Sequence, residues 1–334
     1  MASSSGGRVP KALVLFSGGL DSMLAVKLML EQGLDVEAVN FTTPFYICDE
    51  SLIDRFSEEL RIKVHKVFLG DEFLRIVENP RYGYGSQMNP CIDCRILMFR
   101  KAKELADKIG ADFIVTGEVL DERPFSQRRE AMLLIERASG LEGKILRPLS
   151  AKLLPESEPE KKGLVDRSKL LAIRGRRRSP QMELAKKMGL REYLNPSGGC
   201  LLTDPQFARR LRDHLKCEGR LTLEAVELLK VGRHFRLGNV KIVVGRNREE
   251  NLILSRIAEK MGVTRLKVKG YKGPITLYLG MEKPEFIEKA AALTARYSDA
   301  PRTRLVEVCV YKGGEEKTLK AKAMEDRELA ALRV

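Results

Sequence analysis

The sequence predicts an α/β protein in which a doubly wound parallel sheet is followed by a second, smaller α+β domain. In the first third of the chain, short apolar runs alternate with segments of helical periodicity. This alternation is typical of a parallel sheet covered by helices on both faces. The chain has 334 residues, more than the roughly 100 to 200 residues of a usual single domain, and its pattern changes after residue 219.

The elements of the first domain follow from apolar spacing. Strands are expected at 11–16, 36–41, 63–68 and 112–116, and helices at 19–32, 51–60 and 94–109. Pro, Glu, Ser, Lys and Gly dominate 153–169, which predicts an exposed connection or a flexible loop. A helical stretch follows.

The second domain mixes helices and strands in a different order. Helices are expected at 222–230 and 249–261, and strands at 234–235, 240–244, 265–268, 275–279 and 306–311. We therefore divide the chain into a disordered leader (1–9), a nucleotide-binding domain (10–154), a linker and helical segment that carries Cys200 (155–218), and an α+β domain (219–334).

The amino-acid composition limits the kinds of partner that this protein is expected to bind. The chain has 60 Lys and Arg residues against 46 Asp and Glu, a net charge of +14, which favours an anionic partner such as RNA or an acidic membrane surface. No run of about 18 apolar residues and no signal peptide are present, so we expect a cytoplasmic protein without a membrane partner. Six cysteines in such a chain indicate metal or redox chemistry rather than a disulfide framework.

A candidate phosphate loop, FSGGLDS, joins the first strand to the first helix at 16–22. Gly18 and Gly19 let the backbone approach a phosphate, Ser17 and Ser22 add hydroxyl groups, and the helix amino terminus attracts anions. Asp21 fits if it holds Mg²⁺ beside a pyrophosphate. The alternative is a glycine-rich turn in which Asp21 and Ser22 cap the helix.

The SGGxDS pattern resembles the PP-loop of ATP pyrophosphatases (HUP-like fold) and differs from the Walker sequence. Such families cleave ATP to AMP and pyrophosphate and activate a carbonyl oxygen as an adenylate. The resemblance implies ATP and Mg²⁺ as cofactors, with Asp21 as the catalytic residue that binds Mg²⁺ through the pyrophosphate. It implies that ATP is bound by Phe16, Ser17, Gly18, Gly19, Asp21 and Ser22.

Further runs are similar to the tRNA 4-thiouridine synthetases: 94–120, Thr116-Gly117-Glu118, Ser126-Gln127 and ILRPLS at 145–150. The resemblance implies that Gly117 and Gln127 border the adenosine and that Arg95 approaches the phosphates. Here 116–127 is a residue longer than the family pattern, and Arg123-Pro124-Phe125 replaces small residues. A strand-end turn for Gly117 and a solvated Arg95 are the alternatives.

Three cysteines form a second group of candidate functional residues, in addition to the phosphate loop. Cys91 and Cys94 lie in NPCIDC, and Cys200 ends PSGGC. The NPxxxC element also resembles the tRNA 2-thiouridine synthetases, whose second functional Cys aligns with Cys200. The favoured hypothesis is that Cys91, Cys94 and Cys200 ligate three irons of a [4Fe-4S] cluster and leave one iron open for sulfide.

Two other interpretations of these cysteines stay open. In the first, Cys200 carries a persulfide and Cys94 resolves it, so that both are catalytic. A structural zinc site is the second, although a fourth ligand is not evident. Cys48, Cys217 and Cys309 are isolated and fit packing roles, but Cys48 could also lie near the site.

Basic residues flank Cys200 on both sides, which favours phosphate contacts with RNA over a merely solvated face. The predicted RNA contacts are Arg174, Arg176, Arg177, Arg178, Arg209 and Arg210. The run 232–254 is similar to the small RNA-associated domain of ribosome quality-control factors. We expect this domain to grip tRNA, with Lys267, Lys269 and Lys272 contributing.

Together these resemblances imply ATP-dependent thiolation of a tRNA uridine. Three alternatives remain: an amide-forming or nitrogen-inserting ligase for a small molecule, a non-catalytic RNA-binding factor, and a tRNA desulfurase. The sequence leaves open whether C2 or C4 is modified and which tRNA position is used. It also leaves open the sulfur donor, sulfide or a cysteine desulfurase, and the oligomeric state, with a homodimer as one option.

Overall fold

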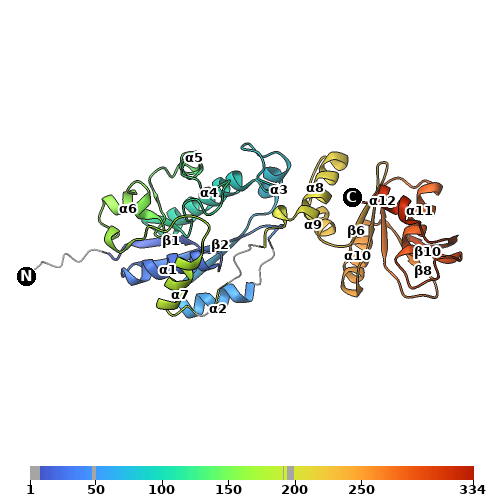
Figure 1. The fold of residues 1–334 in the computed structure, drawn as a ribbon, viewed down its shortest axis with the longest axis horizontal. Coiled ribbons are helices and arrows are strands. Elements are labelled where there is room, and N and C mark those ends of the chain that lie inside the picture. Colours follow the sequence, from blue (N-terminus) through green and yellow to red (C-terminus); the bar gives the residue numbers. More distant parts are fainter. Residues whose placement is uncertain (1–7, 47–49, 191, 194–198) are drawn as a thin grey trace, which may run out of the picture. The chain divides into compact units, whose positions relative to one another are not determined.

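The computed structural model describes residues 8–46, 50–190, 192–193 and 199–334 (Figure 1). It divides into two compact units, the first ending at Thr203 and the second running from Asp204 to Val334. In the described part, no helix is both long enough and apolar enough to cross a membrane.

The first unit contains a five-stranded parallel sheet in the order β3-β2-β1-β4-β5. Its strands are β1 (Lys11–Leu15), β2 (Asp35–Thr42), β3 (Lys63–Phe68), β4 (Phe113–Thr116) and β5 (Ile145–Leu146). The chain moves outward in one direction from β1 to β3 and in the other from β4 to β5. Ligands of such sheets bind at the carboxyl ends of the strands where the order reverses, here between β1 and β4.

Helices cover both faces of this sheet, which confirms the predicted doubly wound class. They are α1 (Leu20–Glu31), α2 (Glu50–Leu60), α3 (Asp71–Glu78), α4 (Cys91–Ile109), α5 (Arg129–Ser139), α6 (Glu158–Lys161) and α7 (Ser179–Lys187), with 3-10 turns η1 (Ala151–Leu153), η2 (Arg167–Lys169) and η3 (Leu201–Thr203). Alternate residues of β1 enter opposite cores. Val14 packs with α1, whereas Leu13 packs with Phe99 of α4 and Ile135 of α5.

The segment 153–169 differs in part from the expected exposed loop. Ser157 and Glu160 form a capping box at the start of α6, and Ser157, Pro159 and Val165 are buried. The other residues of the segment are exposed or half-buried, so it is an exposed connection as predicted, but it contains a short helix that its polar composition did not indicate. Helix α4 also begins at Cys91 rather than at Cys94, which places both thiols on its first turn.

The second unit is built on a six-stranded antiparallel sheet in the order β11-β10-β8-β9-β7-β6. Its elements are α8 (Pro205–Glu218), α9 (Leu223–Lys230), β6 (Arg233–Leu237), β7 (Val240–Val244), α10 (Arg248–Met261), β8 (Thr264–Val268), β9 (Thr276–Leu279), α11 (Pro284–Arg296), β10 (Val306–Lys312), β11 (Glu315–Ala321) and α12 (Asp326–Leu332). Ile242 of β7 packs on the α11 side, while Val243 packs against α9 and α10.

Helix α8 lies in the second unit, although the predicted second domain starts at residue 219. An ion pair of 2.6 Å between Asp213 of α8 and Arg236 of β6 ties the helix to the sheet. Such a long-range contact leaves no local mark in the sequence.

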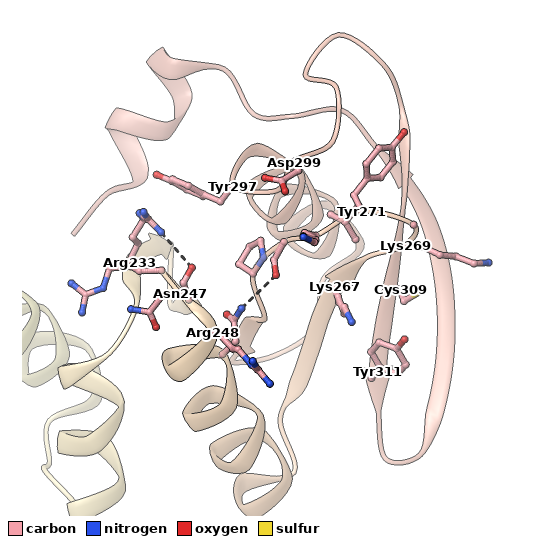
Figure 2. Close-up of a pocket in the computed structure, with 18 of the residues that line it drawn as sticks. Arg233, Asn247, Arg248, Lys267, Lys269, Tyr271, Tyr297, Asp299, Cys309 and Tyr311 are labelled. Carbon is pink, nitrogen blue, oxygen red and sulfur yellow. Dashed lines mark hydrogen bonds between the residues drawn. The ribbon is translucent and has the colours of Figure 1, made fainter.

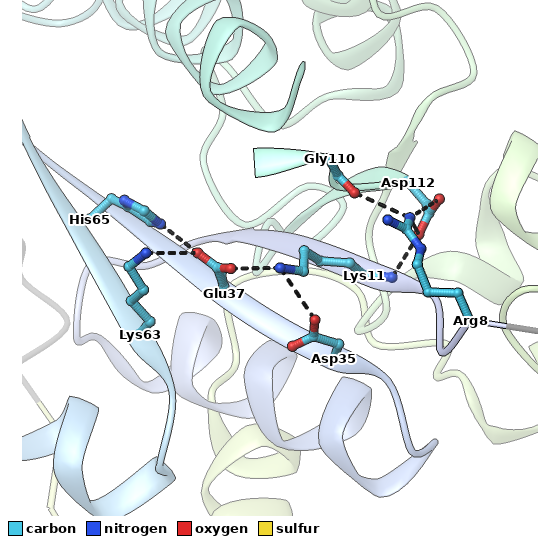
Figure 3. Close-up of polar contacts among 8 residues, drawn as sticks. All are labelled: Arg8, Lys11, Asp35, Glu37, Lys63, His65, Gly110 and Asp112. Atoms are coloured by element: carbon cyan, nitrogen blue, oxygen red, sulfur yellow. Dashed lines mark hydrogen bonds and ion pairs between the residues drawn. The ribbon is translucent and has the colours of Figure 1, made fainter. Parts of the chain in front are cut away.

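Ion pairs line the amino-terminal edge of the parallel sheet (Figure 3). They join Arg8 to Asp112 (2.8 Å), Lys11 to Glu37 (2.7 Å) and Asp35 (3.3 Å), and Lys63 to Glu37 (3.8 Å). His65 Nε2 is also hydrogen-bonded to Glu37 (2.6 Å). Arg8, expected within the disordered leader, is therefore attached to the sheet. Residues 1–7 of that leader lie outside the described residues.

Candidate functional site

The phosphate loop begins where β1 ends, and its first residue is pinned on both sides. The backbone N–H of Phe16 donates to the carbonyl of Val39 (2.8 Å), and the carbonyl of Phe16 accepts from Asn40 Nδ2 (2.8 Å). The Phe16 ring is buried and both backbone groups are bonded to β2, so Phe16 holds the loop in place rather than presenting a free group to ATP. Gly18 has a φ of +72°, a conformation that favours glycine.

The amino terminus of α1 has no side-chain cap at Gly19. Ser22 Oγ donates to the carbonyl of Gly19 (2.8 Å) and lies 3.4 Å from Ser17 Oγ. The first amides of the helix can therefore receive an anion. Asp21 does not act as a cap, because its Oδ2 accepts a hydrogen bond from Arg178 at 2.7 Å.

Gly117 follows β4 and lies against the first turn of α1. A Cβ atom on Gly117 would be 2.5 Å from the carbonyl carbon of Asp21 and 2.7 Å from the amide nitrogen of Ser22. Only glycine permits this approach. The carboxyl ends of β1 and β4 thus lie side by side, at the position where the strand order of the sheet reverses.

Gln127, predicted to border the adenosine, closes the loop that follows Gly117. Its Oε1 accepts from the N–H of Arg123 (3.0 Å), and its carbonyl accepts from the N–H of Asp121 (2.8 Å). The Gln127 side chain is buried, so it orients Arg123.

Arg95, predicted to approach the phosphates, belongs to a buried charge network at the end of β4. Its Nε lies 3.3 Å from Glu118, which also pairs with Arg147 Nε at 3.1 Å. Arg147 pairs in addition with Glu136. Burial opposes the charge on Arg147, but Glu118 and Glu136 outweigh it and raise the pKa of Arg147. Arg95 is thereby held beside β4.

Two predicted RNA contacts, Arg174 and Arg178, turn toward acidic groups of the first unit. Arg178 contacts Asp21 at 2.7 Å and Glu122 at 3.5 Å, and Arg174 pairs with Asp121 at 2.7 Å. Gly175, which lies between them, donates its N–H to the carbonyl of Leu120 (2.8 Å), beside an isolated bridge between Leu120 and Arg174. Arg176 and Arg177 are exposed.

Several buried polar atoms near Asp21 have no hydrogen-bond partner in the described part of the chain: Asp21 Oδ1, Arg178 Nε, and both amide atoms of the fully buried Gln181. Burial raises the pKa of Asp21, and Arg178, Gln181 and Arg123 partly offset the rise. Buried polar groups without partners are uncommon in folded proteins. Sequence reasoning missed Gln181, because the run RGRRRSPQ carried only a charge signal.

The three predicted cysteines come from two segments. Cys91 and Cys94 lie on the first turn of α4, and Cys200 pairs with Tyr46 in a short β-bridge. The Leu201 N–H donates to the carbonyl of Phe45 (2.9 Å), which fixes Cys200 beside the loop after β2. All three thiols are free.

The pKa values of Cys94 and Cys200 depend on burial, on the neighbouring thiols and on Arg123. Burial raises the pKa of Cys94 to about 12, with Cys200 and Cys91 adding to the rise. Burial likewise raises the pKa of Cys200 to about 11. Arg123 lowers both values and also the pKa of Asp21. Arg123, which replaces a small residue of the family pattern, therefore acts on the phosphate loop and on the thiols.

Across the described ranges, no three His, Cys, Asp or Glu side chains are close enough to hold a metal ion. As they stand, the three thiols do not fit a preformed cluster site. The unpartnered Asp21 Oδ1 does fit a ligand of Mg²⁺ bound to pyrophosphate. Cys48 lies outside the described residues, Cys217 is exposed and Cys309 is buried.

The predicted RNA contacts of α8 lie in the second unit. Arg209 donates to the carbonyl of Arg333 (3.1 Å), and Arg210 lies 5.7 Å from the ring centre of Phe207. Arg209 is exposed and Arg210 is half-buried.

Comparison with known families confirms both resemblances. Residues 7–152 match the family model of the thiamine biosynthesis protein (ThiI), and residues 232–333 match the NFACT protein RNA binding domain. The first match falls within the first unit and the second within the second unit.

Curated relatives match part of the chain. A tRNA-specific 2-thiouridylase of Syntrophotalea carbinolica is 35% identical over 31% of this chain and 33% of its own length. A probable tRNA sulfurtransferase of a Thermoanaerobacter species is 32% identical over 34% and 30%. The chain thus spans about a third of the length of these relatives. A solved 4-thiouridine synthetase–RNA complex with bound ATP shares 22% identity over 62% of this chain and 50% of its own, at a TM-score of 0.40.

Proposed function

We propose that this chain is an ATP-dependent tRNA sulfurtransferase that adenylates a uridine carbonyl oxygen and then replaces that oxygen with sulfur. The proposal is supported by the ThiI-type match and by relatives named tRNA 2-thiouridylase and tRNA sulfurtransferase. The NFACT-type match at 232–333 supports RNA as the partner.

The observation that carries the proposal is the end of α1 that faces the carboxyl ends of the strands. Gly19 leaves this helix without a side-chain cap, and the buried Asp21 Oδ1 has no hydrogen-bond partner in the described part of the chain. Cys200 forms a bridge with Tyr46, which follows β2, and β2 is the parallel neighbour of β1 in the sheet. The phosphate loop and Cys200 therefore both lie beyond the carboxyl ends of adjacent strands, where ligands of such sheets bind, so ATP activation and sulfur delivery could meet there.

In the proposed first step, the loop 17–19 and the amino terminus of α1 bind the pyrophosphate portion of ATP. Mg²⁺ held at Asp21 would neutralise the phosphate charge. Gly117 borders the adenosine, and Arg95 and Arg178 stabilise the charge on the phosphates. The uridine oxygen attacks the α-phosphorus, and the bond to pyrophosphate breaks.

Sulfur transfer is assigned to the cysteines. A cysteine desulfurase first transfers sulfur from its own persulfide to Cys200. The terminal sulfur of the Cys200 persulfide attacks the activated uridine carbon, and AMP leaves with the original oxygen. Cys94 then attacks Cys200 Sγ while its thiol proton passes to the released thiouridine, and a Cys94–Cys200 disulfide forms; an external thiol reductant restores both cysteines. In the cluster hypothesis, Cys91, Cys94 and Cys200 would ligate three irons, and no step is assigned to that group because the thiols do not converge here.

Mass spectrometry of nucleosides tests the proposal. Unmodified tRNA is incubated anaerobically with Mg-ATP in two arms, one with sulfide and protein reconstituted with iron and sulfide, the other with iron-free protein, a cysteine desulfurase, cysteine and a thiol reductant, each beside an Asp21→Ala control. We expect a thiouridine that is absent from the control, and its retention time separates the 2-thio from the 4-thio product. Release of AMP without thiouridine would overturn thiolation in favour of another nucleophile, and no AMP release would favour a non-catalytic RNA-binding role.

Iron and acid-labile sulfide analysis of the same protein separates the two sulfur hypotheses. About four irons per chain, lost together in Cys91→Ser, Cys94→Ser and Cys200→Ser, would support the cluster. Activity in iron-free protein that needs Cys94 and Cys200 but not Cys91 would support the persulfide.

A further inference from the structure

A groove of about 990 Å³ crosses the second unit (Figure 2). Its walls come from the start of β6, the amino terminus of α10, the end of β8 with the loop 269–274, and the end of α11. Figure 2 shows Arg233 and Tyr297 on one side, and Lys267 and Tyr311 on the other. None of these residues belongs to the phosphate loop or the thiols.

The groove is strongly basic. Its lining includes six cationic residues, Arg233, Arg246, Arg248, Lys267, Lys269 and Lys272, against the acids Asp299 and Glu316. Arg246 is paired with Glu250, and Lys269 with Glu307 at 3.4 Å. Arg248, Lys267 and Lys272 form no ion pair within the described part of the chain, so their charges are available to an anion.

Aromatic side chains interrupt the basic surface. Tyr271, Tyr297 and Tyr311 line the groove, and 43% of Tyr271 is exposed to solvent. The guanidinium of Arg233 lies 4.5 Å from the ring centre of Tyr297, and that of Arg265 lies 4.9 Å from the ring of Tyr311. Cations combined with exposed rings suit a ligand that has both phosphates and flat bases.

The loop that carries Tyr271 is held in place at both ends. The N–H of Lys269 donates to the carbonyl of Glu307 (2.9 Å), and the carbonyl of Lys272 accepts from the N–H of Asp299 (2.9 Å). Asn251 of α10 accepts from the N–H of Ile275 (2.9 Å). A loop fixed in this way loses little entropy when a ligand binds.

We propose that this groove binds single-stranded RNA, with a base stacked on Tyr271 and phosphates on Arg248, Lys267 and Lys272. Stacking on an exposed ring requires an unpaired base, whereas a duplex hides its base faces. Under the proposed function, on which this identification of the RNA rests, the occupant is an unpaired segment of the substrate tRNA.

Fluorescence anisotropy with the full chain and a labelled 12-nucleotide RNA, without ATP, tests the groove. Tyr271→Ala should weaken binding roughly ten-fold, while Tyr271→Phe, which keeps the ring, should bind like the wild type. The double variant Lys267→Ala/Lys272→Ala should reduce the slope of log affinity against log salt by about 1.4, because two phosphate contacts are lost. Lys320→Ala/Lys322→Ala, two exposed lysines outside the groove, should leave the slope unchanged.

Circular dichroism of each variant establishes that it is folded. Equal affinity of folded Tyr271→Ala and wild type, equal salt slopes for the two double variants, or preferred binding of a 12-base-pair duplex would each overturn the proposal. These measurements do not use ATP. Groove-dependent RNA binding by a chain that makes no thiouridine would therefore preserve this inference and overturn only the proposed function.

Discussion

In the parallel sheet of the first unit, charged groups at the amino-terminal ends of the strands are paired differently from those at the carboxyl ends. We call these two sides of the sheet its amino-terminal edge and its carboxyl edge. At the amino-terminal edge, Glu37 receives Lys11 and His65, and Arg8 pairs with Asp112. At the carboxyl edge, Asp21 Oδ1 and Arg178 Nε are buried without partners in the described residues. The first edge, called the complete edge below, pairs its charges within the sheet. The second, the incomplete edge, leaves buried polar atoms without partners among the described residues, which fits the ATP site that we propose there.

The largest expected effect comes from the incomplete edge. Asp21→Ala should reduce pyrophosphate release about 1,000-fold, and Arg178→Ala about 100-fold, because the proposed function assigns both charged groups to the reacting phosphates. The measurement is kcat/KM for ATP, determined from pyrophosphate release at saturating tRNA.

Arg8→Ala is the matched control, since it removes an arginine of the complete edge. Its turnover should stay within about two-fold of the wild type. A loss of turnover in Arg8→Ala as large as that in Arg178→Ala would remove the distinction between the edges.

The thiols should share the dry surroundings of the carboxyl edge. With pKa values of about 12 for Cys94 and about 11 for Cys200, both are almost fully protonated at pH 7, and the thiolate is the reactive form. Iodoacetamide should therefore label them at least roughly 30-fold more slowly than the exposed Cys217. Labelling of Cys200 should accelerate about 100-fold between pH 7 and pH 9.

Peptide mass spectrometry after timed labelling measures these rates. Modification of Cys94 or Cys200 as fast as that of Cys217 at pH 7 would contradict the buried, protonated thiols and favour an open, activated nucleophile.

A substitution that disturbs close packing at the carboxyl edge should have a smaller effect on turnover. Gly117→Ala would place a Cβ atom 2.5 Å from the backbone of Asp21, which should cost about 1–3 kcal/mol of unfolding free energy and shift the phosphate loop. Turnover should fall about ten-fold or more. Urea denaturation and pyrophosphate release measure the two consequences.

Gly70→Ala is the comparison, because its Cβ would contact only the Phe68 ring, at 3.1 Å. That ring is 58% exposed and can move away. Equal losses in the two variants would show that glycine substitution itself, rather than the approach to Asp21, is responsible.

Short-range sequence patterns were sufficient to predict the strands, the loop and the helix that surround the candidate site. The apolar run of β1, the glycines after it and the strand before Gly117 are short-range signals, and they correctly predicted strand, loop and helix at 11–32 and a strand at 112–116. The strand order, and the contact between Asp21 and Arg178 across 157 positions, have no local pattern that reports them. The basic run predicts an RNA surface or a solvated face, whereas folding turns Arg178 inward. Likewise, the unusual Arg123 was noted as a departure, but its action on Asp21 and Cys200 depends on the folded loop.

The smallest effect belongs to the complete edge. Burial raises the pKa of Glu37, but hydrogen bonds from Lys11 and His65 outweigh it, so the pKa lies below the usual 4.5. An acid with a lowered folded pKa contributes stability above its unfolded pKa and loses it as the pH falls through the folded value. Glu37→Gln should therefore lower the unfolding free energy by about 1 kcal/mol at pH 7, and the difference should vanish toward pH 3.

Urea denaturation of Glu37→Gln and wild type at both pH values measures this difference, and pyrophosphate release at pH 7 should be unchanged. A difference that persists at pH 3 would assign the effect to packing rather than charge. Reduced turnover without reduced stability would mean that the amino-terminal edge communicates with the site, and the contrast between a stabilising edge and a functional edge would fail.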